Sequence, residues 1–150
     1  MSTSPIGSTG YHRAVTTYYD LESATAMLDR VRPMAEALRD QRAEVARLTE
    51  RLRVAQLDEE TDPAVASVLR ARIRAIVDQM EGAVDRLDDW GIVLRDIRSG
   101  LLDFPALVDG RRVWLCWRFG EDEVAWWHET TTGFEGRQPA SELTGSRQTT

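Results

Sequence analysis

The side chains best suited to chemistry gather in one short stretch, WLCWRFGEDEVAWWHE, at positions 114–129. This stretch contains four of the five tryptophans, the single cysteine, Cys116, and one of the two histidines, His128. A thiol and an imidazole can each serve as a nucleophile, a proton carrier or a metal ligand. The aromatic side chains around them can line a small-molecule site or form an apolar docking surface. The stretch therefore indicates either a reaction or ligand site, or a surface against which another molecule packs.

Each polar residue of this stretch also has a purely structural interpretation. We predict that His128 is a hydrogen-bonded core histidine, with proton transfer or ligand binding as the alternative. The neighbouring Glu129 projects to the opposite face of an extended strand, so the two side chains do not share one ligand. Cys116 is interpreted as a small buried hydrophobe, because no lysine or helix N-terminus lies nearby to favour its thiolate.

Three polar residues outside the stretch are further candidates. Asp103 stands directly before a Phe-Pro pair and is predicted to cap a turn. Arg137 and Gln138 carry planar donor groups that suit a carboxylate or a phosphate, although such groups also anchor loops to backbone carbonyls. These residues extend the candidate ligand site beyond the tryptophan-rich stretch.

Familiar catalytic and metal-binding motifs are missing from the sequence. It has no Cys-x-x-Cys, His-Glu-x-x-His or Gly-x-Ser-x-Gly motif and no glycine-rich phosphate loop. With His12 and His128 as the two histidines, a metal site would depend on carboxylates, and no spacing of these stands out. We therefore assign no catalytic residue, no metal ligand and no cofactor from the sequence.

The composition predicts one soluble domain. The chain has 150 residues, of which 42% are hydrophobic and 29% charged, and no apolar run approaches the roughly 20 residues of a membrane span. Its net charge is −6, whereas a duplex binder needs a surplus of positive charge, so we expect no nucleic acid partner. A single cysteine and a start unlike a secretory signal favour a cytoplasmic location. We predict a flexible tail over 1–17, one domain over 18–140 and a second flexible tail over 141–150, with His12 solvated in the first tail.

The first half of the domain is predicted to be a helical hairpin over residues 20–90. Asp20 is placed to cap a helix from Leu21 to about Leu57, with Pro33 expected to kink it or split off a short first segment. We expect this bend to turn Gln41, which interrupts the apolar seam, toward solvent. The alternative is that Gln41 lies in the seam, where a polar residue favours one register. The seam repeats every seven residues at Ala24, Val31, Leu38, Val45 and Leu52, and again at Met27, Met34, Gln41, Leu48 and Ala55.

A second helix is predicted from Pro63 to about Trp90, antiparallel to the first. Asp62 suits the N-cap, proline suits the first helical position, and Gly91 supplies a C-terminal stop. A short connection between two amphipathic helices makes them neighbours. The predicted first half is therefore coiled-coil-like.

The second half, residues 91–140, is predicted to be a small antiparallel sheet of three to four strands, which makes the fold class α+β. Hydrophobic alternation favours strands at 92–96, 112–119 and 124–129, and the Asp109-Gly110 pair indicates a tight hairpin turn. Pairing position 119 with 124 places Leu115 opposite His128. The expected faces are Val113, Leu115, Trp117, Phe119, Val124, Trp126 and His128 on one side, and Trp114, Cys116, Arg118, Ala125, Trp127 and Glu129 on the other.

Three segments together resemble a known family. YYDLESATAMLDRVRP, GLLDFPALVDGRRVWLCWRFGEDEVAWWHE and GFEGRQP are similar, in this order, to a prokaryotic family known as domain of unknown function 2203. The resemblance covers Tyr18 to Pro139 and implies a helical hairpin with a small sheet and no established activity. It also implies that the residues on the family's motif positions form the site, namely Asp103, Trp117, His128, Gly136, Arg137 and Gln138.

Two functions are compatible with these observations. We favour a non-enzymatic interaction module, a homodimer or a dock for another protein, because the helices are too long for the sheet to cover and both sheet faces are apolar. The alternative is a small-ligand- or metal-binding enzyme with a pocket between sheet and loop, near His128, Asp103, Glu129 and Arg137. The expected partners are thus a second copy or another protein, with a small molecule possible and with no nucleic acid and no membrane.

Overall fold

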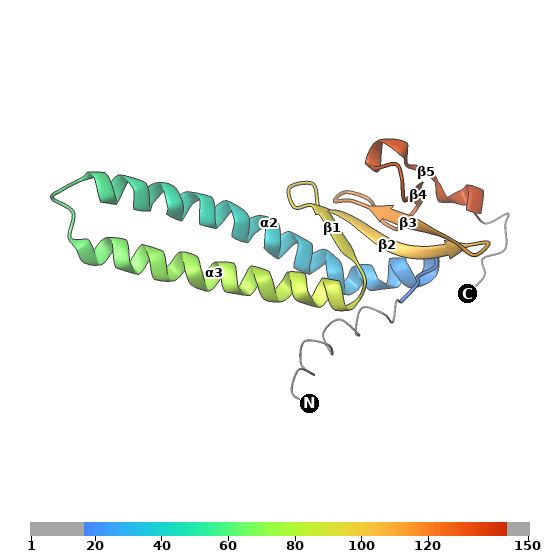
Figure 1. Ribbon diagram of the computed structural model, residues 1–150, viewed down its shortest axis with the longest axis horizontal. Helices are drawn as coiled ribbons and strands as arrows, with labels where there is room; N and C mark the ends of the chain where they lie inside the picture. Colours follow the sequence, from blue (N-terminus) through green and yellow to red (C-terminus); the bar gives the residue numbers. More distant parts are fainter. Residues whose placement is uncertain (1–16, 144–150) are drawn as a thin grey trace, which may run out of the picture.

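The computed structural model describes residues 17–143 and has the predicted α+β architecture (Figure 1). Residues 1–16 and 144–150, which contain His12 and most of the two predicted tails, lie outside the described part. A helical hairpin comes first and a five-stranded antiparallel sheet follows, in the order β1-β2-β3-β4-β5. The elements are α2 (Leu21–Leu57), α3 (Pro63–Asp89), β1 (Val93–Asp96), β2 (Leu101–Val108), β3 (Arg111–Trp117), β4 (Trp126–Glu129), β5 (Gln138–Pro139) and two 3-10 turns, η1 (Phe134–Gly136) and η2 (Ala140–Leu143).

Helix α2 begins at the predicted cap. The Asp20 side chain accepts a hydrogen bond from the Ser23 amide at 2.8 Å, and the Ser23 hydroxyl receives one from the Asp20 amide at 3.0 Å. The helix then continues through Pro33 to Leu57, so of the two effects expected at this proline, a kink or a split, the split was wrong. Proline removes one donor, and the packing of Val31 and Ala35 on either side outweighs that loss.

Helix α3 has the predicted start and end. The Asp62 side chain accepts from the Ala64 amide at 2.9 Å, and Pro63 occupies the first helical turn. Gly91 has a φ of +76°, the left-handed conformation that favours glycine after a helix. Within residues 17–143, neither helix has the long apolar stretch that a membrane-crossing helix needs.

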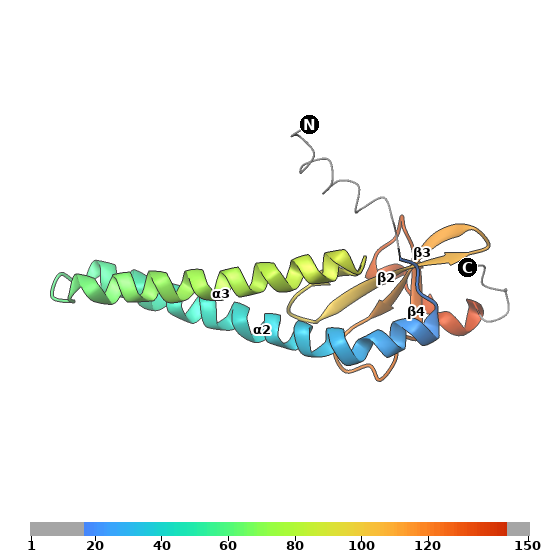
Figure 2. The same ribbon diagram turned by 90° about the horizontal axis from the view of Figure 1, so that it is seen from below.

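The first half of α2 positions the sheet, whereas the rest of the hairpin projects beyond it (Figures 1 and 2). Within the sheet region, α2 buries its apolar stripe against the strands, and the Val124 amide donates to the Thr25 hydroxyl at 3.1 Å. One face of the sheet is thereby closed by helix. The core joins Ala24, Leu28, Val31 and Leu38 of α2 to Leu102, Phe104, Ala106, Val113, Leu115, Trp117 and Trp127 of the sheet.

Gln41 faces the partner helix. Its side-chain amide donates to the Gln79 side chain of α3 at 3.1 Å, and the residue is partly buried. The expected exposure of Gln41 is therefore met only in part, since the side chain is partly exposed but reaches the partner helix. Because α2 is not split at Pro33, the heptad phase is kept past the proline, and the polar position of one helix pairs with a polar position of the other.

The sheet register differs from the predicted one by one residue between β3 and β4. Leu115 lies opposite Trp127, and Trp114 lies opposite His128, where we expected Leu115 opposite His128. The connection over 118–125 is an irregular loop fixed by its own bonds, including one from the Trp117 indole to the Glu121 carbonyl at 2.8 Å. Because this loop is not a tight hairpin, pairing position 119 with 124 and counting outward gave the wrong register.

The predicted turn at Asp109-Gly110 is also present. Both turn residues have positive φ, 54° and 79°, as a tight turn between β2 and β3 requires. The sheet has five strands, one more than the largest number expected, because the Gln138–Pro139 segment adds an edge strand beside β4. Leu143 is buried against the core, three residues beyond the predicted end of the domain.

Candidate functional site

Two rows of side chains run across the sheet face that the helices leave uncovered. In the first row, Asp103 of β2 pairs with Cys116 of β3, which pairs with Trp126 of β4. In the second, Trp114 of β3 lies between Pro105 and His128. Cross-strand partners project to the same side of a sheet, so all six side chains share this outer face. Trp126 and His128 thus lie with Cys116 rather than with Leu115, as the register difference requires.

Asp103 and His128 form a buried ionisable pair across β3. Both Asp103 carboxylate oxygens lie 3.1 Å from His128 Nε2, and the two residues are 1% and 4% exposed. Arg95 of β1 donates from Nε to the same carboxylate at 2.8 Å. Asp103 was predicted to cap a turn. That was wrong, because the residue lies inside β2 and its side chain is the centre of a polar network.

Both ring nitrogens of His128 face hydrogen-bond acceptors. Its Nδ1 lies 2.8 Å from the Glu129 carbonyl, which can only accept, so Nδ1 carries a proton and donates. In the neutral ring Nε2 would then be an acceptor that faces a second acceptor, the Asp103 carboxylate. Two acceptors at 3.1 Å need positive charge between them, either a proton on Nε2 or a bound cation.

Cys116 lies beside this pair. One oxygen of Asp103, the sulfur of Cys116 and one ring nitrogen of His128 lie within 4.8 Å of one another, and all three residues are buried. Burial, reinforced by the Asp103 charge, raises the pKa of the Cys116 thiol to about 12. The residue is therefore a thiol at neutral pH, which argues against a free thiolate nucleophile.

A cavity of about 230 Å³ opens beside the pair, between the sheet and the loop that follows β4. Its polar lining comes from Asp103, His128 and Arg95, together with two threonines of the loop. Its apolar lining includes two aromatic walls. The complete set is Arg95, Leu101, Asp103, Trp114, His128, Thr130, Thr132, Gly133 and Phe134.

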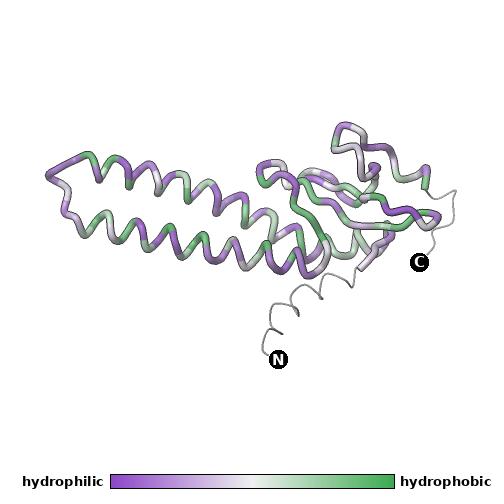
Figure 3. The backbone as a smooth tube through the Cα atoms, in the orientation of Figure 1, coloured by the Kyte–Doolittle hydropathy of each residue, from purple (hydrophilic) through white to green (hydrophobic). Residues whose placement is uncertain are grey.

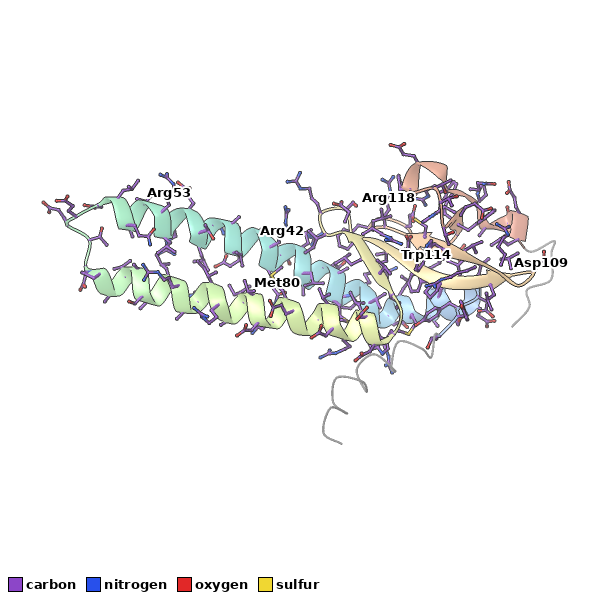
Figure 4. The ribbon with its side chains drawn as sticks, in the orientation of Figure 1. Arg42, Arg53, Met80, Asp109, Trp114 and Arg118 are labelled. Atoms are coloured by element: carbon purple, nitrogen blue, oxygen red, sulfur yellow. The ribbon has the colours of Figure 1, made fainter. Side chains whose placement is uncertain are left out.

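Two arginines stack on one of these walls. The guanidinium carbons of Arg95 and Arg112 lie 5.0 and 4.9 Å from the centre of the Trp114 ring. Arg95 alone also contacts Asp103 and lines the cavity. Figure 4 shows Trp114 within the sheet, far from Met80 and Arg42 on the hairpin. The cavity and the hairpin are therefore separate candidate surfaces.

Arg137 holds the C-terminal loop onto the same outer face. Its guanidinium stacks on Trp126 at 4.4 Å and on Phe134 at 4.6 Å, and it pairs with Glu121. Its Nε is buried and has no hydrogen-bond partner among the described residues. Among the described residues Arg137 thus contacts a carboxylate and two aromatic rings, whereas the alternative to ligand binding was an anchor to backbone carbonyls.

Of the six predicted ligand-binding residues, two line the cavity and four do not. Asp103 and His128 come together at the cavity. Trp117 points to the helix-covered face, where it belongs to the core, and the Glu129 side chain pairs with Arg111. Gln138 is exposed on β5. Sequence reasoning missed Arg95, Trp114, Thr130, Thr132 and Phe134, and the correct strand register would have indicated Trp114 as a neighbour of His128.

Comparisons with known proteins identify the family but no characterised relative. No curated protein and no solved structure matches the chain. One family model matches residues 17–140, which is most of the chain and includes both the hairpin and the outer-face site. Its description is "Uncharacterized conserved protein (DUF2203)", and the chain belongs to this family.

Proposed function

We propose that the protein binds a small anionic molecule in the cavity between the outer sheet face and the loop after β4. The observation that carries this proposal is the buried pair of Asp103 and His128 beside a cavity. Arg95 bonds to Asp103 and also lines this cavity. A core histidine with a merely structural role needs neither a carboxylate partner nor a cavity. Buried polar networks next to aromatic walls are typical of small-molecule sites.

The size and lining of the cavity limit the ligand. At about 230 Å³ it is smaller than pockets for drug-sized molecules, which start near roughly 300 Å³. Arg95 uses Nε for Asp103, and its two amino groups have no hydrogen bond within residues 17–143, so they are available to a carboxylate. The hydroxyls of Thr130 and Thr132 offer further donors. We therefore propose a compact carboxylate as the ligand, and a cytoplasmic setting that keeps Cys116 reduced.

Ligand-observed NMR with a panel of small carboxylic acids and their uncharged amides tests this function. We expect at least one acid to bind the wild-type protein while its amide does not. Arg95→Met should weaken that binding by about tenfold or more, because it removes the cation at the cavity rim. Arg112→Met is the matched control, since Arg112 stacks on the same tryptophan without lining the cavity. Equal binding of acid and amide, or equal loss in both variants, would contradict the proposal.

A second candidate function, pairing with another copy of this chain, is favoured by a groove on the hairpin. The groove has a volume of about 370 Å³ and contains Val84, which is 46% exposed. Figure 3 shows hydrophobic residues recurring along both helices beyond the sheet. The groove is lined by Arg42 and Val45 of α2 and by Val77, Met80, Glu81, Val84 and Asp85 of α3.

The opposite charges on the two walls of the groove favour a second copy of this chain as its partner. One wall carries Arg42 and the other carries Glu81 and Asp85, so a two-fold axis through the groove places opposite charges against each other. Light scattering at micromolar concentration should then give a dimer, and Val84→Asp should give a monomer. Val54→Asp, at an exposed valine outside the groove, should leave the dimer intact. A monomeric wild-type protein would rule out this second function.

A further inference from the structure

We infer that Asp103, Cys116 and His128 bind one divalent transition metal ion of the zinc type, with an open coordination position facing the cavity. The inference concerns the same site as the proposed function and rests on it in one respect, namely that the small carboxylate would occupy the open position. Metal binding was part of the alternative function, but no metal ligand could be assigned from the sequence, because the three residues are 13 and 12 positions apart and meet only through strand pairing.

The geometry of the three donors suits a single ion. Zinc bonds are about 2.0–2.3 Å long for nitrogen, oxygen and sulfur ligands, so tetrahedral ligands lie about 3.3–3.8 Å apart. The donor atoms here lie within 4.8 Å of one another, and the nitrogen–oxygen separation is 3.1 Å. Small side-chain rotations therefore suffice to bring all three atoms to bonding distance of one ion.

The chemistry of the donors points to zinc rather than magnesium or calcium. One thiolate, one imidazole and one carboxylate form the mixed set that a borderline-soft ion prefers, whereas hard ions take oxygen ligands. Three protein ligands with a fourth position left open are typical of sites where zinc binds a substrate or water. Asp103, His128 and the cavity meet at this position.

The surrounding contacts already orient the donors. The Glu129 carbonyl holds the proton on His128 Nδ1, so the Nε2 lone pair points toward Asp103. Metal-binding histidines typically make this kind of second hydrogen bond. Arg95 fixes the carboxylate from its other side. An ion between Nε2 and the carboxylate would supply the positive charge that the two facing acceptors require.

The binding step is balanced in protons and charge. The Cys116 thiol releases its proton to solvent as the sulfur–metal bond forms, and any proton on His128 Nε2 leaves in the same way. The resulting thiolate and carboxylate together neutralise the 2+ ion. Arg95 then contributes one positive charge beside the open position, which favours an anionic ligand there.

Titration of the EDTA-treated full chain with Co²⁺ alone tests the inference, because cobalt bound to a thiolate gives a near-ultraviolet charge-transfer band. We expect saturable binding of one Co²⁺ per chain with this band, and loss of the band when Zn²⁺ displaces the cobalt. Cys116→Ser should abolish the band, and His128→Gln should weaken binding by at least about tenfold. His12→Gln and Asp109→Asn are matched controls at the other histidine and at an exposed turn carboxylate, and both should bind as the wild type does.

Several results would overturn the inference. These are no saturable Co²⁺ binding by the folded wild-type protein, binding without the thiolate band, or a band that survives Cys116→Ser. The wild-type band needs no variant, so the test does not depend on whether substitutions in the buried cluster fold. The carboxylate panel, run with EDTA and with Zn²⁺, separates the two proposals. An acid bound in EDTA without any Co²⁺ site overturns the metal inference alone, whereas a Co²⁺ site without any bound acid overturns the proposed function alone.

Discussion

Asp103 and His128 lie 3.1 Å apart although their strands, β2 and β4, are separated by β3. The two side chains meet over the outer face of the sheet, beside Cys116 on the intervening strand. This contact needs the order and register of three strands at once. The pair therefore couples the stability of the sheet to the candidate site.

Asp103→Ala should lower the free energy of unfolding by about 3 kcal/mol, because it leaves Nε2 of buried His128 and Nε of Arg95 without their partner. Asp40→Ala is the control, since Asp40 is exposed on α2 and, within residues 17–143, pairs only with exposed Arg39. It should change stability by less than about 0.5 kcal/mol. Urea denaturation of both variants measures the difference. Equal losses would show that the Asp103–His128 pair contributes nothing specific.

Gly136→Ala should disturb the cavity from outside. A Cβ at this position would lie 2.7 Å from Cβ and 2.8 Å from Oγ1 of Thr132, a cavity-lining residue, so the loop has to move. We expect a loss of stability of about 1–3 kcal/mol and weaker binding of the carboxylate. Gly133→Ala provides the comparison in the same loop, because a Cβ there meets nothing within 4 Å. A Gly136→Ala protein as stable as Gly133→Ala would speak against this close contact.

Asp20→Ala should destabilise the protein by about 1 kcal/mol near neutral pH through loss of the capping box at the start of α2. The bond from the Ser23 amide, above all, keeps the pKa of Asp20 below its usual 3.8. A lowered folded-state pKa stabilises the fold above the unfolded-state value, and this stabilisation is lost as the pH falls through the folded-state value. The gap between wild type and variant in melting temperature should therefore narrow below about pH 4. A gap that is constant with pH would mean that the carboxylate charge does not matter.

Replacing both Gln41 and Gln79 by leucine should stabilise the hairpin slightly, because Gln41 interrupts the apolar seam of α2 and its hydrogen bond to exposed Gln79 is open to solvent. We expect Gln41→Leu alone to gain little, since it leaves the Gln79 amide facing an apolar side chain. A double-mutant cycle measured by thermal unfolding gives the coupling between the two positions. Strictly additive effects would show that the two glutamines do not interact.

The hairpin could be predicted closely because its signals are local. The cap at Asp20, the Asp62-Pro63 start and the stop at Gly91 depend on residues within one helical turn, and the structure confirms all three. Pro33 misled the prediction, since the packing that keeps α2 continuous involves the distant sheet. Helix propensity describes the local effect of a proline on the helix, but it does not include the tertiary contacts that offset this effect.

The site could be predicted only in part, for a related reason. Strands β1, β3 and β4 and their face alternation follow from the sequence, but β2, which carries Asp103, was not predicted. Which residues of β3 and β4 face one another depends on the irregular loop between them. One residue of register moved His128 from the helix-covered face to the outer face beside Cys116. Arg95 carries no local signal at all, because its role comes from Asp103 on the neighbouring strand.

The most direct test of the proposed function is an amide and indole NMR titration of the labelled protein with the acid that binds most tightly in the carboxylate panel. The account predicts shifts concentrated at the cavity lining, above all at the Trp114 indole and at Thr130 and Thr132, with none at the hairpin groove around Val84. It also predicts that Arg95→Met removes these shifts and that Arg112→Met keeps them. Shifts centred on the hairpin groove, or shifts at the cavity that persist unchanged in Arg95→Met, would contradict it.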